Sequence, residues 1–148
     1  MVEFSIRPAK KEDFSAIKEL IQAVQINPTG LDWRRFLVAV APGNELLGCG
    51  QIKDHRDGSM ELASIAVQET ARGQGIARAI IEELLTREPK RPLYLMCQAR
   101  LELLYTKFGF QTIGVPEMRK YFQMVSRAER IFNKQAEAQD RLRVMRLG

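Results

Sequence analysis

The stretch from Ile65 to Ala79, IAVQETARGQGIARA, constrains the fold more than any other part of the sequence. It places Arg72, Gly73 and Gly75 between an apolar run typical of a strand and a run with helical periodicity. The first amides of a helix have no acceptor within the helix, and they lie at the positive end of the helix dipole. Glycines let an anion approach these amides, and an arginine binds phosphate oxygens. The stretch therefore predicts a pyrophosphate or polyphosphate site over Arg72 to Ala77.

This motif differs from two other phosphate-binding loops. A Walker loop requires a glycine, four residues of any kind and then Gly-Lys-Ser/Thr, and no such string occurs. A dinucleotide fingerprint requires a small residue where Arg78 stands. Taken by itself, the motif also fits a glycine-bearing turn before a core helix that binds nothing.

Apolar patterning predicts one domain over residues 1–148, with no linker dividing it. We expect an α/β fold with a central mixed, mostly antiparallel sheet of about seven strands, flanked by helices. The core spans residues 2–114, followed by a helical insertion at 116–139 and a last strand at 142–147. The other expected strands are residues 2–7, 35–41, 45–54, 60–67, 92–97 and 109–114, and the other helices are 13–24, 76–87 and 100–108.

Composition excludes several classes of protein. Hydrophobic residues make up 45% and charged residues 28%, which is typical of a folded globular chain. No apolar run approaches the roughly 18 residues of a membrane-spanning helix. Two cysteines and one histidine do not suffice for a disulfide framework or a usual zinc site. We therefore expect a reduced cytoplasmic protein without a metal and without a membrane partner.

The formal charge of +5 is concentrated near the C-terminus. Residues 115–148 hold eight basic and four acidic side chains. A basic tail favours anionic partners, but no nucleic-acid-binding motif accompanies it. We interpret it as a solvated helix face and do not expect a nucleic-acid partner.

Two segments together resemble a known family. Residues 72–77, RGQGIA, are similar to the Arg/Gln-x-x-Gly-x-Gly/Ala signature of the GNAT superfamily of acetyl-CoA-dependent N-acetyltransferases. Residues 104–110, LYTKFGF, resemble that family's Leu-Tyr-x-x-x-Gly-Phe segment. The expected order of strands and helices is also similar, over residues 2–114.

The resemblance implies roles for individual residues. In this family a bulge in the strand at 60–67 leaves backbone groups unpaired, and the pantetheine arm of CoA pairs with them. The implied pantetheine and thioester site is Ile65, Ala66 and Val67, and the implied pyrophosphate site is Arg72, Gly73, Gln74, Gly75, Ile76 and Ala77. Tyr105 matches the family's general-acid tyrosine, and Gln98 stands where many members have a cofactor-contacting asparagine.

The general base is less clearly marked. Some members use a glutamate on the fifth strand, where this sequence has Leu93. We expect Glu61 to take its place, directly or through water, and the alternative is an ordinary surface carboxylate. His55 is interpreted as a solvated loop residue, and Cys97 as a small core residue.

These features predict an N-acetyltransferase that moves acetyl from acetyl-CoA to a primary amine by direct attack in a ternary complex. The alternative is a non-catalytic acyl-CoA sensor or interaction module of the same fold. The resemblance implies that the segment around Trp33 helps to form the wall of the amine-acceptor site. The alternative is that Trp33 anchors its loop to the core. The helix at 116–139 caps the acceptor channel, packs on its own sheet, or pairs with a second subunit in a homodimer.

Overall fold

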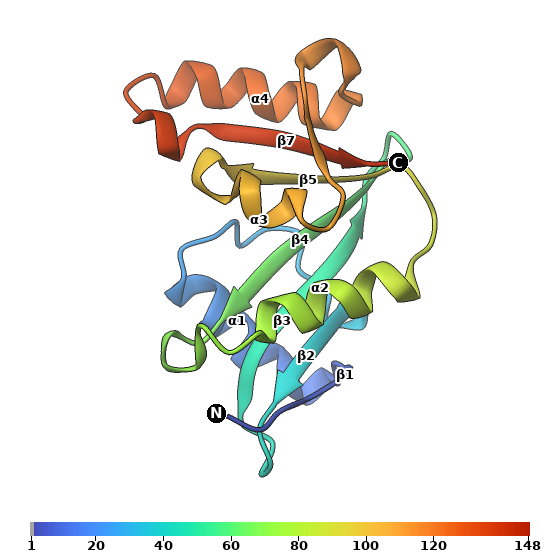
Figure 1. The fold of residues 1–148 in the computed structure, drawn as a ribbon, viewed down its shortest axis with the longest axis vertical. Helices are drawn as coiled ribbons and strands as arrows, with labels where there is room; N and C mark the ends of the chain where they lie inside the picture. Colours follow the sequence, from blue (N-terminus) through green and yellow to red (C-terminus); the bar gives the residue numbers. More distant parts are fainter. Residues whose placement is uncertain (1) are drawn as a thin grey trace. The chain divides into compact units, whose positions relative to one another are not determined.

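The computed structural model describes residues 2–148, in which seven strands and four α-helices follow the predicted order (Figure 1). The strands are β1 (Ser5–Pro8), β2 (Phe36–Val40), β3 (Leu46–Asp54), β4 (Met60–Val67), β5 (Leu93–Gln98), β6 (Gln111–Ile113) and β7 (Leu142–Leu147). The helices are α1 (Phe14–Ala23), α2 (Ile76–Arg87), α3 (Glu102–Thr106) and α4 (Lys120–Phe132). The expected α/β class is confirmed. None of the helices in residues 2–148 is long and apolar enough to cross a lipid bilayer.

The chain divides into two compact units. The first unit comprises residues 2–53 and 62–89, and the second comprises residues 54–61 and 90–148. The β3–β4 hairpin therefore contributes its strands mainly to the first unit and its turn to the second.

The first unit is built on strands in the order β1-β2-β3-β4. β1 and β2 are antiparallel, as are β2 and β3. β2 is buried along its whole length, as its continuous apolar run FLVAV predicts. Ile17, Leu20 and Ile21 of α1 pack into the core of this unit. Helix α2 contacts β2 and approaches β3 closely, because a Cβ atom on Gly48 would lie 2.9 Å from the Ile76 side chain.

The second unit contains strands in the order β5-β7-β6, with β7 antiparallel to both neighbours. Its core cluster consists of Tyr94, Ile113, Phe122 and Val144. Helix α4 lies beside β7 (Figure 1). It contributes Phe122 to this cluster. The last strand, predicted at residues 142–147, is confirmed.

Helix α4 is shorter than the predicted helix at 116–139. It spans Lys120–Phe132, preceded by a 3₁₀ turn at Val115–Glu117 and followed by another at Ala138–Asp140. Asn133 leaves the helical conformation, and Arg141 donates hydrogen bonds to the carbonyls of Asn133 and Lys134. Arg141 therefore holds the segment that follows the helix in a non-helical path. Phe132, the last residue of the helix, is 86% exposed.

Candidate active site

The glycine loop, residues 72–77, has the backbone that anion binding requires. Gly73 and Gly75 both adopt left-handed conformations, with φ of +76° and +81°. Gly75 is also the residue from which α2 begins. No atom lies within 4 Å of the position that a Cβ would occupy on either glycine. An anion can therefore approach the first amides of α2 without meeting a side chain from these two positions.

Two side chains of the loop are tied to neighbouring backbone in the first unit. Arg72 Nε donates to the carbonyl of Val67 at 3.4 Å, at the end of β4. The side-chain carbonyl of Gln74 accepts a hydrogen bond from the backbone amide of Val2. The loop is thus fastened at both sides, and Arg72, which is exposed, lies against the strand expected to bind pantetheine.

Strand β4 is irregular just before Ile65. Ser64 has a φ of +61°, a conformation uncommon for a residue with a Cβ. Its hydroxyl accepts from Gln51 Nε2 at 2.9 Å, and its carbonyl accepts from the Cys49 thiol at 3.5 Å. This is the kind of departure from extended geometry that a bulge produces. The contact between Gln51 and Ser64 was not predicted from the sequence. A polar glutamine within the otherwise buried strand β3 is a signal that could have pointed to it.

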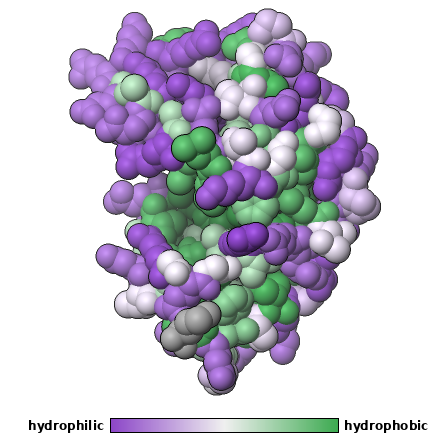
Figure 2. Space-filling model, viewed as in Figure 1, coloured by the Kyte–Doolittle hydropathy of each residue, from purple (hydrophilic) through white to green (hydrophobic). Residues whose placement is uncertain are grey.

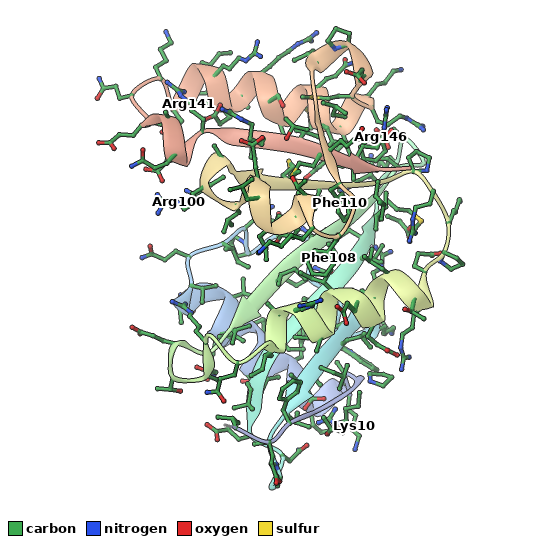
Figure 3. All side chains as sticks on the ribbon, in the orientation of Figure 1. Lys10, Arg100, Phe108, Phe110, Arg141 and Arg146 are labelled. Atoms are coloured by element: carbon green, nitrogen blue, oxygen red, sulfur yellow. The ribbon has the colours of Figure 1, made fainter. Side chains whose placement is uncertain are left out.

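Tyr105 is positioned in the second unit by the short helix α3. It is 8% exposed, and its ring meets Phe110 edge-on with centroids 6.3 Å apart. Phe110 is completely buried in the second unit (Figure 3). Burial, with a smaller contribution from Cys97, raises the pKa of Tyr105 to about 12. The phenol therefore holds its proton at neutral pH. Gln98, at the end of β5, is exposed.

Glu61 and His55 form a pair in the second unit that is largely shielded from solvent. His55 Nε2 lies 2.8 Å from Glu61 Oε1, and the two side chains are 11% and 5% exposed. The Tyr121 ring of α4 stacks on the imidazole with centroids 3.6 Å apart. The interpretation of His55 as a solvated loop residue is therefore wrong. Tyr121 covers it from 66 positions further along the chain, and no local pattern reports such a contact.

Glu61 also affects Tyr121. Burial, with the charge of Glu61, raises the pKa of the Tyr121 phenol. Glu61 itself is 4% exposed and is not the surface carboxylate of the alternative interpretation. A buried carboxylate that lies beside an imidazole is a candidate proton acceptor.

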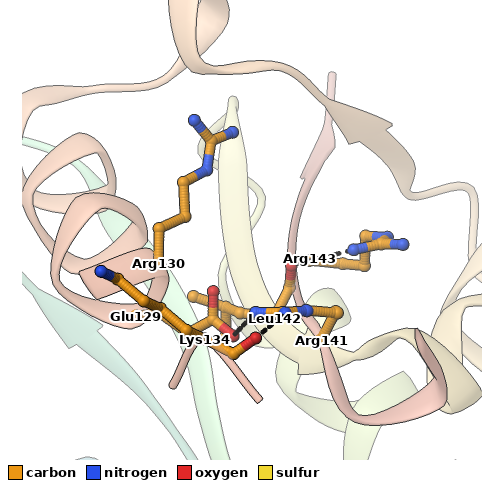
Figure 4. A pocket seen from close by; sticks show the side chains of 6 residues that line it. All are labelled: Glu129, Arg130, Lys134, Arg141, Leu142 and Arg143. Carbon is orange, nitrogen blue, oxygen red and sulfur yellow. Dashed lines mark hydrogen bonds and ion pairs between the residues drawn. The ribbon is translucent and has the colours of Figure 1, made fainter. Parts of the chain in front are cut away.

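A basic pocket lies elsewhere in the second unit, between the end of α4 and the start of β7. It has a volume of about 390 Å³, and it is lined by Glu129, Arg130, Lys134, Arg141, Leu142 and Arg143 (Figure 4). Hydrophilic side chains predominate over this part of the surface (Figure 2).

Two of the arginines that line this pocket, Arg141 and Arg143, have structural partners. Arg141 binds the carbonyls at the end of α4 and lies 3.7 Å from Glu129. Arg143 pairs with Glu102, and Arg146, at the other end of β7 (Figure 3), pairs with Glu117. Much of the basic charge of residues 115–148 therefore serves the fold of its own unit.

Comparison with known proteins decides the family. The acetyltransferase (GNAT) domain family matches residues 32–112, which is more than half of the chain. The chain belongs to the GNAT family. No curated protein sequence matches it.

The fold of this GNAT protein is shared with several solved structures. N-acetylglutamate synthase from Neisseria gonorrhoeae, solved with coenzyme A and N-acetyl-glutamate, superimposes with a TM-score of 0.76 at 18% identity. That match covers 99% of this chain and 35% of the synthase, so the chain spans about a third of that enzyme. Rv2747 from Mycobacterium tuberculosis, solved with CoA and a second ligand, gives 0.70 at 22% identity, covering 97% of this chain and 98% of that one. An acyl-CoA N-acyltransferase from Pseudomonas aeruginosa gives 0.68 at 19% identity, with full coverage of both chains.

Family membership fixes the general activity. The GNAT protein is an acyltransferase.

Proposed function

We propose that the chain is an N-acetyltransferase that moves the acetyl group of acetyl-CoA directly to a primary amine within a ternary complex. The observation that carries the proposal is the pair of left-handed glycines that opens α2, with open space beside each of them. Such a loop suits a diphosphate, because its amides already point outward from the first turn of a helix. The proposal assigns the pyrophosphate of acetyl-CoA to Arg72, Gly73, Gln74, Gly75, Ile76 and Ala77.

The backbone of β4 is assigned to the pantetheine arm. Ile65 and Val67 would pair with it as strand partners, as in strand addition to a sheet edge. The amide of Ala66 would hold the thioester oxygen, where negative charge grows when an amine attacks, and a preorganised N–H stabilises that charge. The conformation of Ser64 supports this assignment, because it interrupts β4 directly before Ile65. Gln98 is assigned to the cofactor by its place in the motif alone.

Attack requires a neutral amine. At pH 7, removing the proton from a lysine-like amine costs about 4 to 5 kcal/mol, and from an α-amine about 1 to 1.5 kcal/mol. Glu61 is assigned as the group that accepts this proton, directly or through water. Tyr105 is assigned as the acid that protonates the departing thiolate. The phenol holds its proton at neutral pH, so it is in the form that can donate when the thiolate leaves.

The acceptor is proposed to be a small amine or a protein amine. The Neisseria enzyme was solved with an N-acetylated amino acid, so amino acids are the first acceptors to test. Polyamines, arylalkylamines, aminoglycosides and lysine peptides complete the panel, with release of the CoA thiol as the readout. If acetyl-CoA binds but no amine releases thiol, the result favours the non-catalytic sensor.

Binding of acetyl-CoA is tested by stabilisation against unfolding. At a concentration 100 times its dissociation constant, acetyl-CoA should stabilise the protein by about 2.7 kcal/mol. Arg72→Glu should remove most of this shift, because it replaces an attractive charge with a repulsive one. Arg87→Glu, at the opposite end of α2, is the matched control and should keep the shift. If millimolar acetyl-CoA does not stabilise the wild-type protein against unfolding, the assignment of the pyrophosphate site is contradicted.

The acid is tested separately from binding. Tyr105→Phe keeps the ring packed against Phe110 and removes only the hydroxyl. We expect unchanged stabilisation by acetyl-CoA and a loss of turnover of about 100-fold, the lower end for general acid catalysis. Equal turnover in the two proteins would remove Tyr105 from the mechanism.

A further inference from the structure

The His55–Glu61 pair offers a role for the turn between β3 and β4 and for helix α4. Glu61 is almost fully withdrawn from water, and burial of a carboxylate favours its neutral form unless a donor stabilises the charge. Nε2 of His55, at 2.8 Å, is in position to be such a donor. With the proton on Nε2, the imidazole favours the ionised carboxylate, which is the form that can accept a proton from an ammonium group.

The imidazole is held from two further sides by α4. Tyr121 stacks on its face at 3.6 Å with ring planes 16° apart, and Phe122 meets it edge-on at 5.7 Å. The helix is fastened to the same turn, since the Tyr121 amide donates to Asp57 Oδ2 at 3.0 Å and Arg119 donates to the Asp57 carbonyl. The position of the His55 ring is therefore set by α4 as well as by its own turn.

His55 also lines a cavity of about 440 Å³ in the second unit. The charged and titratable groups that line it with His55 are Asp54, Arg56 and Asp57 of the turn, and Lys120 and Tyr121 of α4. Both signs of charge are present among them. The carboxylate nearest to the imidazole is that of Glu61, at 2.8 Å from Nε2.

We propose that His55 is a positioning residue of the acyl transfer, which orients the Glu61 carboxylate and keeps it ionised, while Tyr121 of α4 holds the imidazole in place. This inference rests on the proposed role of Glu61 as proton acceptor. In each turnover Glu61 takes one proton from the acceptor ammonium and later returns it to water, and His55 keeps its own proton on Nε2. Helix α4 thereby becomes part of the catalytic apparatus.

The test compares two substitutions of His55. His55→Leu removes the donor and keeps an apolar side chain under Tyr121, whereas His55→Gln keeps an N–H near the position of Nε2. We expect His55→Leu to lower kcat by about tenfold, the effect of losing a hydrogen bond to a charged group. The KM for acetyl-CoA should stay within about twofold of the wild-type value, because the substitution removes no contact that is proposed to bind acetyl-CoA. The acidic limb of the kcat/KM profile should move to higher pH, and His55→Gln should restore much of both properties.

A double-mutant cycle separates this role from general damage to the fold. If His55 acts through Glu61, then His55→Leu should change kcat by less than about twofold in a Glu61→Gln background. Losses that multiply, or an acidic limb that does not move in His55→Leu, would overturn the inference. If Glu61→Gln alone retains wild-type turnover, the base assignment under the proposed function fails first.

Two substitutions on α4 complete the design. Tyr121→Ala removes the stacked ring and should reproduce the shift of the acidic limb, and it serves if His55→Leu does not fold. Met124 lines the same cavity and is 62% exposed. Met124→Ala should therefore leave the pH profile of kcat/KM unchanged. A wild-type profile for Tyr121→Ala would contradict the part assigned to α4.

Discussion

At the scale of single residues, Gly75 combines a structural and a functional demand. Its φ of +81° is unfavourable for any residue with a Cβ, but nothing occupies the space that the Cβ would enter. Gly75→Ala should therefore cost about 1 kcal/mol of stability through backbone conformation alone. It should also weaken acetyl-CoA binding by about tenfold, because it adds a methyl group at the start of α2, where the charged diphosphate is proposed to bind. Urea unfolding and calorimetric titration measure the two effects.

Gly43 provides the matched control for this residue. It also has a left-handed backbone, with φ of +93°, and no neighbour within 4 Å of a Cβ, but it lies in the turn between β2 and β3. Gly43→Ala should lose similar stability and keep its affinity for acetyl-CoA. Equal loss of affinity in both variants would mean that the glycine loop has no special part in binding.

At the scale of elements, the start of α4 depends on a residue from outside the helix. No side chain from its own N-cap satisfies the first amides, and Asp57 accepts from the amide of Tyr121 instead. Burial alone would raise the pKa of Asp57, but hydrogen bonds from Ser59 and the Tyr121 amide, with the charge of Arg119, lower it to about 2. Asp57 therefore acts as a cap supplied through the tertiary structure.

Asp57→Asn should destabilise the protein by about 1 kcal/mol at pH 7, a value discounted for the water around this partly exposed group. A lowered pKa means that the contribution is complete above the ordinary value near 4 and is lost as the pH falls through about 2. The difference between the two proteins should thus be constant from pH 7 to about 4.5 and shrink below that. Urea unfolding across this range measures it, with Glu69→Gln, an exposed carboxylate, as the control. A difference that persists unchanged to pH 2 would contradict this account.

At the scale of the whole molecule, the burial of both thiols makes them poor nucleophiles for the transfer. Burial raises the pKa of Cys49 to about 12 and that of Cys97 to about 11. At pH 8 only about one Cys97 thiol in a thousand would be ionised, and the thiolate is the reactive form. An acetyl-cysteine intermediate therefore has no activated nucleophile, and direct attack by the amine is expected.

Initial-rate kinetics test this expectation. Double-reciprocal plots at several amine concentrations should intersect, as they do for a ternary complex, and parallel lines would indicate a covalent intermediate. The native protein should react slowly with a thiol reagent at pH 8, and both cysteines should react once it is unfolded. Rapid labelling of the native protein would show that the thiols are more accessible than their burial implies.

The sequence by itself determined the order of the strands and helices, the glycine-opened start of α2 and the resemblance to the GNAT family. These features depend on local periodicity, on the backbone freedom of Gly73 and Gly75, and on motifs that lie within a few residues. The tertiary structure alone decided that His55 is withdrawn from solvent, that Asp57 caps α4, and that α4 ends at Phe132 with Arg141 bound to the two carbonyls that follow it. Each of these depends on partners far apart along the chain or supplied by another element, and a periodic pattern reports which face of an element is apolar but not which residue covers it.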